Sequence, residues 1–175
     1  MAEVYSYIVH VWTEDGSEYQ SAAAFFETGI TEDEEWGNVP FIALSGATET
    51  PPIFRTEQKI LNMGIMSARL YITAVGVYKV YINGQAADKN VHIAPGYCDG
   101  ERSIAYQIYD VTEMISENRV AVSVVTGTGW MDHNGSDIMG STSNREGVKA
   151  LLIIKYKDGT TKHIATDTKV GGITE

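Results

Sequence analysis

Residues 68–84, which read ARLYITAVGVYKVYING, decide the fold. Apolar side chains recur at every second position, which is the period of a strand with one buried face. That face is expected to carry Ala68, Leu70, Ile72 and Ala74. Gly76 interrupts the pattern and predicts a bulge or bend, after which a strand continues through residues 77–82. Asn83-Gly84 follows and predicts a tight hairpin turn, because both residue types tolerate positive φ.

Short strand patterns also flank this stretch on both sides. They are expected at residues 4–12, 21–26, 54–61, 105–109, 119–125, 149–156 and 162–166. Turn signals such as Asp158-Gly159 separate them, and Asp110 is positioned to cap one short helical turn over residues 111–116. Strand 119–125 should bury its three alternate valines together. The sequence therefore predicts an all-β fold, a jelly-roll-like β-sandwich with an N-terminal β-hairpin and one short helical turn.

Residues 31–53 lack a clear period and contain Pro40, Pro51 and Pro52, which break regular structure. This segment is expected to be a linker that packs partly through its aromatic side chains. Its acidic run, residues 32–35, is read either as a solvated face or as a first helical turn capped by Thr31.

Composition narrows the classes of partner. The chain has 175 residues, with 13 Lys and Arg against 23 Asp and Glu, and a formal net charge of −10. Such a chain is repelled by phosphate, which argues against nucleic acid and anionic membranes as partners. Cys98 is the single cysteine, so an intrachain disulfide is excluded. The sequence has no apolar run near the ~18 residues that a membrane span needs, and no leading signal peptide is expected.

A glycine-rich loop at residues 127–147 offers the densest group of possible ligands. Asp132, Asn134 and Asp137 provide the hard oxygen atoms that Ca²⁺ prefers. With Trp130 beside them, Asp132 and Asn134 could instead contact sugar hydroxyls. The competing interpretation is a polar surface loop whose tryptophan belongs to the core.

A second polar patch contains Tyr97 and Asp99, which could stack on a sugar ring and bind its hydroxyls. Ordinary turn chemistry explains the same residues. No serine-hydrolase, zinc-protease, C-x-x-C or phosphate-loop motif is present in the sequence, and no catalytic residue is predicted. Carboxylate pairs for glycoside hydrolysis are not recognisable from spacing in so acidic a chain.

Several blocks together resemble the N-terminal β-sandwich of bacterial α-L-rhamnosidases, in that family's order and spacing. The blocks are residues 68–78, 80–84, 94–97, 106–112, 118–121 and 127–130, and the resemblance spans roughly residues 54–170. Residues 7–12, 14–16 and 25–29 resemble the last hairpin of the fibronectin-like domain that precedes this sandwich in the family. The resemblance thus implies a terminal hairpin at 1–30, a linker at 31–53 and an accessory β-sandwich at 54–175, with Arg69, Tyr71 and Tyr78 alternating along paired strands.

The resemblance implies an accessory, substrate-recognising module rather than an enzyme. The family's inverting hydrolysis belongs to a helical barrel whose carboxylate motifs are not found in this chain, so the fragment is expected not to hydrolyse rhamnosides. Some members bind L-rhamnose through Ca²⁺, which makes a rhamnose-containing glycan, Ca²⁺ and the parent's catalytic domain the implied partners. Met131 and Asp132 stand where the family usually has an aromatic and a basic residue. The alternative is a structural module that positions the barrel and binds no sugar.

The hairpin at residues 4–26 is expected to present an unpaired strand edge. We therefore predict that it packs on the sandwich or pairs with a neighbouring chain in a dimer. The compartment is left open between the bacterial cytoplasm and secretion or the periplasm. The chain is also expected to be cut from a longer parent at both ends.

Overall fold

The computed structural model describes residues 3–44, 51–61, 63–97, 104–115, 118–127, 129, 147–167 and 171–173. The chain divides into two compact units, Met1–Asn38 and Val39–Glu175. The division falls inside the segment that the sequence analysis reads as a linker. In the part of the chain that is described, no helix is long and apolar enough to cross a membrane.

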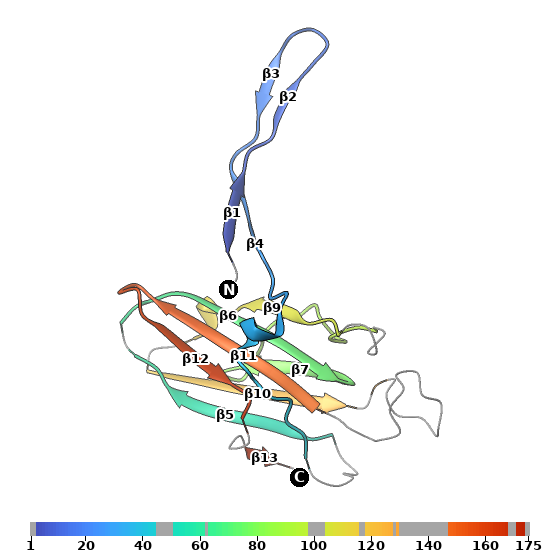
Figure 1. Ribbon diagram of the computed structural model, residues 1–175, viewed down its shortest axis with the longest axis vertical. Coiled ribbons are helices and arrows are strands. Elements are labelled where there is room, and N and C mark those ends of the chain that lie inside the picture. The colour runs from blue at the N-terminus through green and yellow to red at the C-terminus, as the bar shows by residue number, and fades with distance from the viewer. Residues whose placement is uncertain are drawn as a thin grey trace. The chain divides into compact units, whose positions relative to one another are not determined.

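The first unit is an interrupted β-hairpin (Figure 1). Strand β1 (Val4–Tyr7) pairs antiparallel with β4 (Ala24–Glu27), and β2 (His10–Trp12) pairs with β3 (Glu18–Gln20). The predicted continuous strand over residues 4–12 is therefore broken in its middle. There Val9 donates its backbone N–H to the hydroxyl of Ser21 at 3.0 Å, which replaces a ladder bond with a side-chain bond.

Aromatic side chains line this hairpin and are exposed within the chain. Tyr5 stacks on Phe26 with ring centroids 5.3 Å apart, and His10 stacks on Trp12 at 5.9 Å. Trp12 is 68% exposed. The expected packing of the hairpin on another surface stays a prediction.

A short 3₁₀ helix, η1 (Asp33–Trp36), follows the hairpin, so the interpretation of the acidic run as a first helical turn is confirmed. The expected Thr31 cap is wrong: Glu32 occupies the cap position and makes no side-chain capping bond. Thr31 instead donates its backbone N–H to the Glu35 carboxylate at 3.0 Å. The Glu35 side chain reaches back over one turn to bind the Thr31 N–H. This bond stabilises the start of the helix in place of a threonine cap.

The second unit is a β-sandwich, as predicted (Figure 1). Within the described residues, one antiparallel sheet has five strands in the order β13-β5-β10-β7-β8, and the other has four in the order β12-β11-β6-β9. The five strands are β13 (Gly171–Ile173), β5 (Ile53–Lys59), β10 (Arg119–Gly127), β7 (Val77–Ile82) and β8 (Gln85–Ala86). The four are β12 (Thr161–Ala165), β11 (Gly147–Tyr156), β6 (Ile65–Val75) and β9 (Gln107–Asp110).

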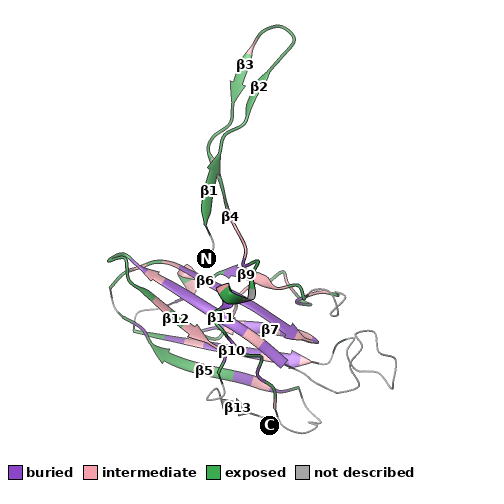
Figure 2. Ribbon diagram, in the orientation of Figure 1, coloured by how far each residue is buried: buried purple, intermediate pink, exposed green. Residues whose placement is uncertain are grey.

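The core lies between the two sheets, where Figure 2 colours the strands as buried. The predicted inward face of β6 is confirmed, since Ala68 and Ile72 are completely buried. The three alternate valines of β10, Val120, Val122 and Val124, are buried too, at 1%, 7% and 4% exposure. On the opposite face of β6, Tyr71 and Thr73 are also buried, so this central strand is covered on both faces.

Gly76 carries the chain from one sheet to the other. The residue has φ 98° and separates β6 from β7, which belong to different sheets. The predicted bend is confirmed, but the expectation that Arg69, Tyr71 and Tyr78 lie along paired strands is wrong. β6 pairs with β11 and β9, whereas β7 pairs with β10 and β8.

The hairpin turn at Asn83-Gly84 is confirmed, with φ 49° and 81° at the two residues. The helical turn is shorter than predicted, because η2 spans only Thr112–Met114. Val111 takes its cap position without a side-chain bond. Asp110 stabilises the entry nonetheless, since its carboxylate accepts the Thr112 N–H at 3.1 Å.

Candidate functional site

Of the predicted site residues, only Tyr97 lies in the part of the chain that the structure describes. Its side chain is 64% exposed. Asp99, Trp130, Asp132, Asn134 and Asp137 lie outside the described residues, so the sugar and Ca²⁺ assignments made on them stay predictions. Among the residues that are described, no group of three or more His, Cys, Asp or Glu side chains could hold a metal ion.

The segment that carries Tyr97 is anchored by partly buried hydrogen bonds. Gln107 donates its side-chain N–H to the Pro95 carbonyl at 2.8 Å and accepts the Tyr78 hydroxyl at 2.7 Å. The backbone N–H of Tyr78 also donates to the Ala94 carbonyl at 2.8 Å. Burial raises the pKa of Tyr78 far above its usual value, so the phenol stays a neutral donor. These bonds hold the backbone before Tyr97 in one place while its ring faces solvent.

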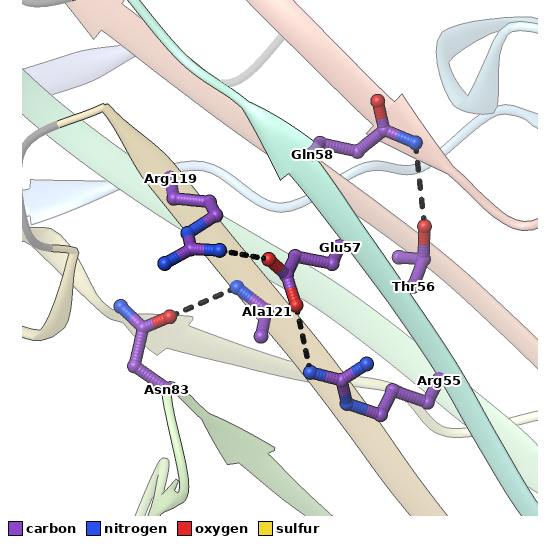
Figure 3. Close-up of polar contacts among 7 residues, drawn as sticks. All are labelled: Arg55, Thr56, Glu57, Gln58, Asn83, Arg119 and Ala121. Carbon is purple, nitrogen blue, oxygen red and sulfur yellow. Dashed lines mark hydrogen bonds and ion pairs between the residues drawn. The ribbon is translucent and has the colours of Figure 1, made fainter.

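A second candidate surface is the outer face of the five-stranded sheet, where one carboxylate joins two guanidinium groups (Figure 3). Glu57 on β5 pairs with Arg55 at 2.9 Å through Oε2 and with Arg119 on β10 at 2.8 Å through Oε1. The hydrogen bond from Arg55 and the nearby charge of Arg119 lower the pKa of the Glu57 carboxyl below its usual range. The arginine side chains remain 46% and 69% exposed.

The strand register extends this surface across three strands. Ser123 on β10 lies directly opposite Arg55 on one side and Tyr81 on the other. Tyr81 and Ser123 are half-buried on the same outward face. The row places an aromatic ring, a hydroxyl and a guanidinium side by side, a combination that suits a ligand with both apolar faces and hydroxyls.

The charge of this surface is opposite to that of the chain. The described strands β5, β10 and β7 direct four cations and one carboxylate outward. We call the set of Arg55, Glu57, Lys59, Lys79, Tyr81, Arg119 and Ser123 the basic sheet face. Lys79 donates to the Val91 carbonyl at 3.0 Å, which fixes the loop beyond the sheet edge. A chain of net charge −10 thus concentrates positive charge on one sheet face.

Asn83 fixes the turn that borders the basic sheet face (Figure 3). Its side-chain oxygen accepts the Ala121 N–H at 2.9 Å, and its side-chain nitrogen donates to the Met114 carbonyl at 2.9 Å. One residue therefore ties the β7–β8 hairpin to β10 and to η2. This contact supports the sheet and leaves the face itself open to solvent.

The sandwich also contains a polar hollow and an apolar cavity. The polar hollow of about 260 Å³ lies beside β5 and β12 and is lined by Gln58, His163 and Asp167 among others. The apolar cavity of about 30 Å³ lies between the sheets and touches Leu70, Val122 and Leu152. That cavity has room for little more than a water molecule, so it is a packing defect rather than a ligand site.

The basic sheet face matches no sequence motif, because its members come from strands far apart in the sequence. Glu57 and Arg119 meet across 62 positions of chain. The alternation of Arg55, Glu57 and Lys59 along one strand is the available local signal, and it identifies an exposed charged face without its partners.

Comparison with known proteins gives a consistent result. Residues 63–171 match the family described as "Alpha-L-rhamnosidase N-terminal domain". An α-L-rhamnosidase of Alteromonas sp. (strain LOR) is 29% identical over 169 residues, covering 91% of this chain and 18% of that protein.

The solved structures agree. The crystal structure of an α-L-rhamnosidase from Aspergillus terreus matches with a TM-score of 0.85 and 28% identity, covering 99% of this chain and 21% of that one. The enzyme from Dictyoglumus thermophilum matches with a TM-score of 0.79 and 25% identity, covering 98% of this chain and 20% of that one. The chain thus spans about a fifth of the length of these relatives.

Proposed function

Because the chain belongs to the family of α-L-rhamnosidase N-terminal domains, we propose that it is an accessory domain that recognises carbohydrate for a catalytic part of its parent protein. The rhamnosidase relatives are about five times longer than the matched region, which leaves ample length for that catalytic part elsewhere. A rhamnose-containing glycan is the proposed ligand.

The observation that carries this proposal is the row of Tyr81, Ser123 and Arg55 on the basic sheet face. Sugar rings pack their apolar faces on aromatic side chains, and their hydroxyls accept and donate hydrogen bonds. The row supplies both kinds of contact on a rigid sheet, which lowers the entropy lost on binding. Tyr97, exposed on its anchored segment, is proposed as a separate sugar contact.

The domain is proposed to be non-catalytic. An inverting glycosidase needs a carboxylic acid and a carboxylate about 6.5–9.5 Å apart on either side of the scissile bond. Glu57 is unsuited to the acid role, because Arg55 and Arg119 lower the pKa of its carboxyl. An aryl-rhamnoside assay tests this point: the chain is expected to give no turnover, and turnover abolished by substituting a carboxylate would overturn the proposal.

Calorimetric titration with L-rhamnose tests the recognition role. We expect millimolar binding that Tyr81→Ala weakens roughly tenfold, the loss for about 1.4 kcal/mol of ring contact. Tyr19→Ala, which removes an exposed tyrosine from the separate hairpin, is the matched control and should bind as the unchanged chain does. No heat signal at millimolar sugar, with and without Ca²⁺, would refute sugar recognition. Loss of binding on chelation would point to Asp132, Asn134 and Asp137.

A structural role is the second candidate. It is favoured by the intrachain partners of Glu57, Lys79 and Asn83, each of which strengthens the sheet without any ligand. On this alternative, variants of the basic sheet face lower the melting temperature and leave sugar titrations flat. Sugar recognition therefore predicts a change in the sugar titrations of these variants, whereas a structural role predicts a change in their melting temperature alone.

A further inference from the structure

The basic sheet face contains a charge arrangement that sheet stability alone disfavours. Arg119 on β10 lies directly opposite Lys59 on β5. Like charges at directly opposed positions destabilise an antiparallel pair, and Lys79 adds a further cation on β7. Local choices that oppose stability concentrate at functional surfaces. Glu57 offsets only one of these positive charges, so the face keeps a net positive charge that an anion from outside the chain would offset.

Glu57 organises the two arginines without using up their donors. Each guanidinium has five N–H donors in a rigid fork, and the bonds to Glu57 take one from Arg55 and one from Arg119. The carboxylate restrains both side chains, which are rich in rotamer entropy when unrestrained. The remaining donors belong to side chains that are 46% and 69% exposed. The pair is thus pre-organised for a second carboxylate.

We propose that the basic sheet face binds an anionic saccharide, in which a uronic-acid carboxylate pairs with Arg55 and Arg119 while a sugar ring packs on Tyr81. Adjacent strands lie about 4.8 Å apart, so Tyr81 and Arg55, two strands apart, are separated by roughly 10 Å. The distance between these two residues is larger than a single small ion. It fits a ligand in which two neighbouring sugar units contact the two residues. The inference rests on the proposed function and narrows its ligand to acidic glycans.

The test compares trigalacturonic acid with the same trisaccharide after its carboxyl groups are reduced to alcohols. Both are titrated into the full chain at low and at high salt. We expect the acidic trisaccharide to bind about threefold to tenfold more tightly at low salt, because two exposed arginines each add a modest ion-pair contribution. Salt should reduce this advantage, because the arginines are exposed and screened.

Three variants identify the groups responsible. Arg119→Gln and Arg55→Gln should each reduce the advantage about twofold to threefold. Lys157→Gln, which deletes one exposed cation from the turn after β11, is the matched control and should bind unchanged. Glu57→Gln should bind the acidic trisaccharide less tightly despite its added positive charge, because the two arginines lose the carboxylate that restrains them. Tighter binding by this variant would contradict the pre-organisation.

The outcomes separate this inference from the proposed function. Equal binding of the acidic and reduced trisaccharides would overturn the inference and leave carbohydrate recognition standing. The inference would also be overturned if poly-L-glutamate binds, neither trisaccharide binds, and the two arginine variants weaken binding of poly-L-glutamate. That result would indicate an acidic protein partner. If neither trisaccharide nor L-rhamnose binds, both proposals fail. Melting temperatures of all variants, measured in parallel, identify any loss of binding that comes from unfolding.

Discussion

Replacing Asn83 with alanine should destabilise the sandwich far more than an exposed turn residue normally would. The change removes two side-chain bonds of 2.9 Å, to the Ala121 N–H and the Met114 carbonyl. Each is worth about 0.5–1.5 kcal/mol net. Alanine must also adopt φ near 49°, which costs an L-residue about 1–2 kcal/mol. The expected loss in the free energy of unfolding is therefore about 2–5 kcal/mol.

Urea unfolding followed by far-UV circular dichroism measures this loss, and three further variants separate its causes. Asn83→Gly loses both bonds, but glycine tolerates the left-handed backbone. Its free energy of unfolding should therefore be about 1 kcal/mol higher than that of Asn83→Ala. Asn83→Asp keeps the acceptor for Ala121 and should lose about 0.5–1.5 kcal/mol. Asn90→Ala, in an exposed loop, is the control and should stay within about 0.5 kcal/mol. An alanine variant as stable as that control would refute the reasoning.

Three other changes test the packing of the core, the ion pairs of Glu57 and the tight contact between Gly129 and Val77. Ile72→Ala, at a completely buried position, should cost about 2–5 kcal/mol by urea unfolding. The Glu57 pKa lies lower in the folded chain than its usual 4.5, so its stabilisation is present above that pH and is lost as pH falls through the folded pKa. The melting temperature of Glu57→Gln should therefore be lower than that of the unchanged chain at pH 7. In acid the two melting temperatures should converge. Gly129→Ala would place a Cβ 2.7 Å from Val77 at φ 57°, and should lower the melting temperature more than Gly159→Ala, whose Cβ meets open space.

Local pattern was sufficient to predict most of the strands. Alternation identified β6, β7 and β10, because their inner faces are buried and their period is set by the pleat. β11 was predicted as a strand-like run, and its burial on both faces leaves no alternation. The Asn83-Gly84 turn was predictable because two adjacent positive φ values leave few other residue choices.

Pairing between distant strands was not predictable in the same way. Nothing local to Gly76 distinguishes a bend within one sheet from a crossing between two, since both need a flexible residue there. The clamp of Arg55, Glu57 and Arg119 depends on the β5–β10 register, which is set by burial across the whole sheet. Tyr97 was identified from composition, but the residues that anchor its segment, Tyr78 and Gln107, come from two further strands.

Mapping backbone amide chemical shifts while the chain is titrated with L-rhamnose tests carbohydrate recognition on the basic sheet face. We expect concentration-dependent shifts clustered at Tyr81, Ser123 and Arg119, with the hairpin strands β2 and β3 unchanged. Saturable shifts confined to any other surface, or none at millimolar sugar, would contradict it.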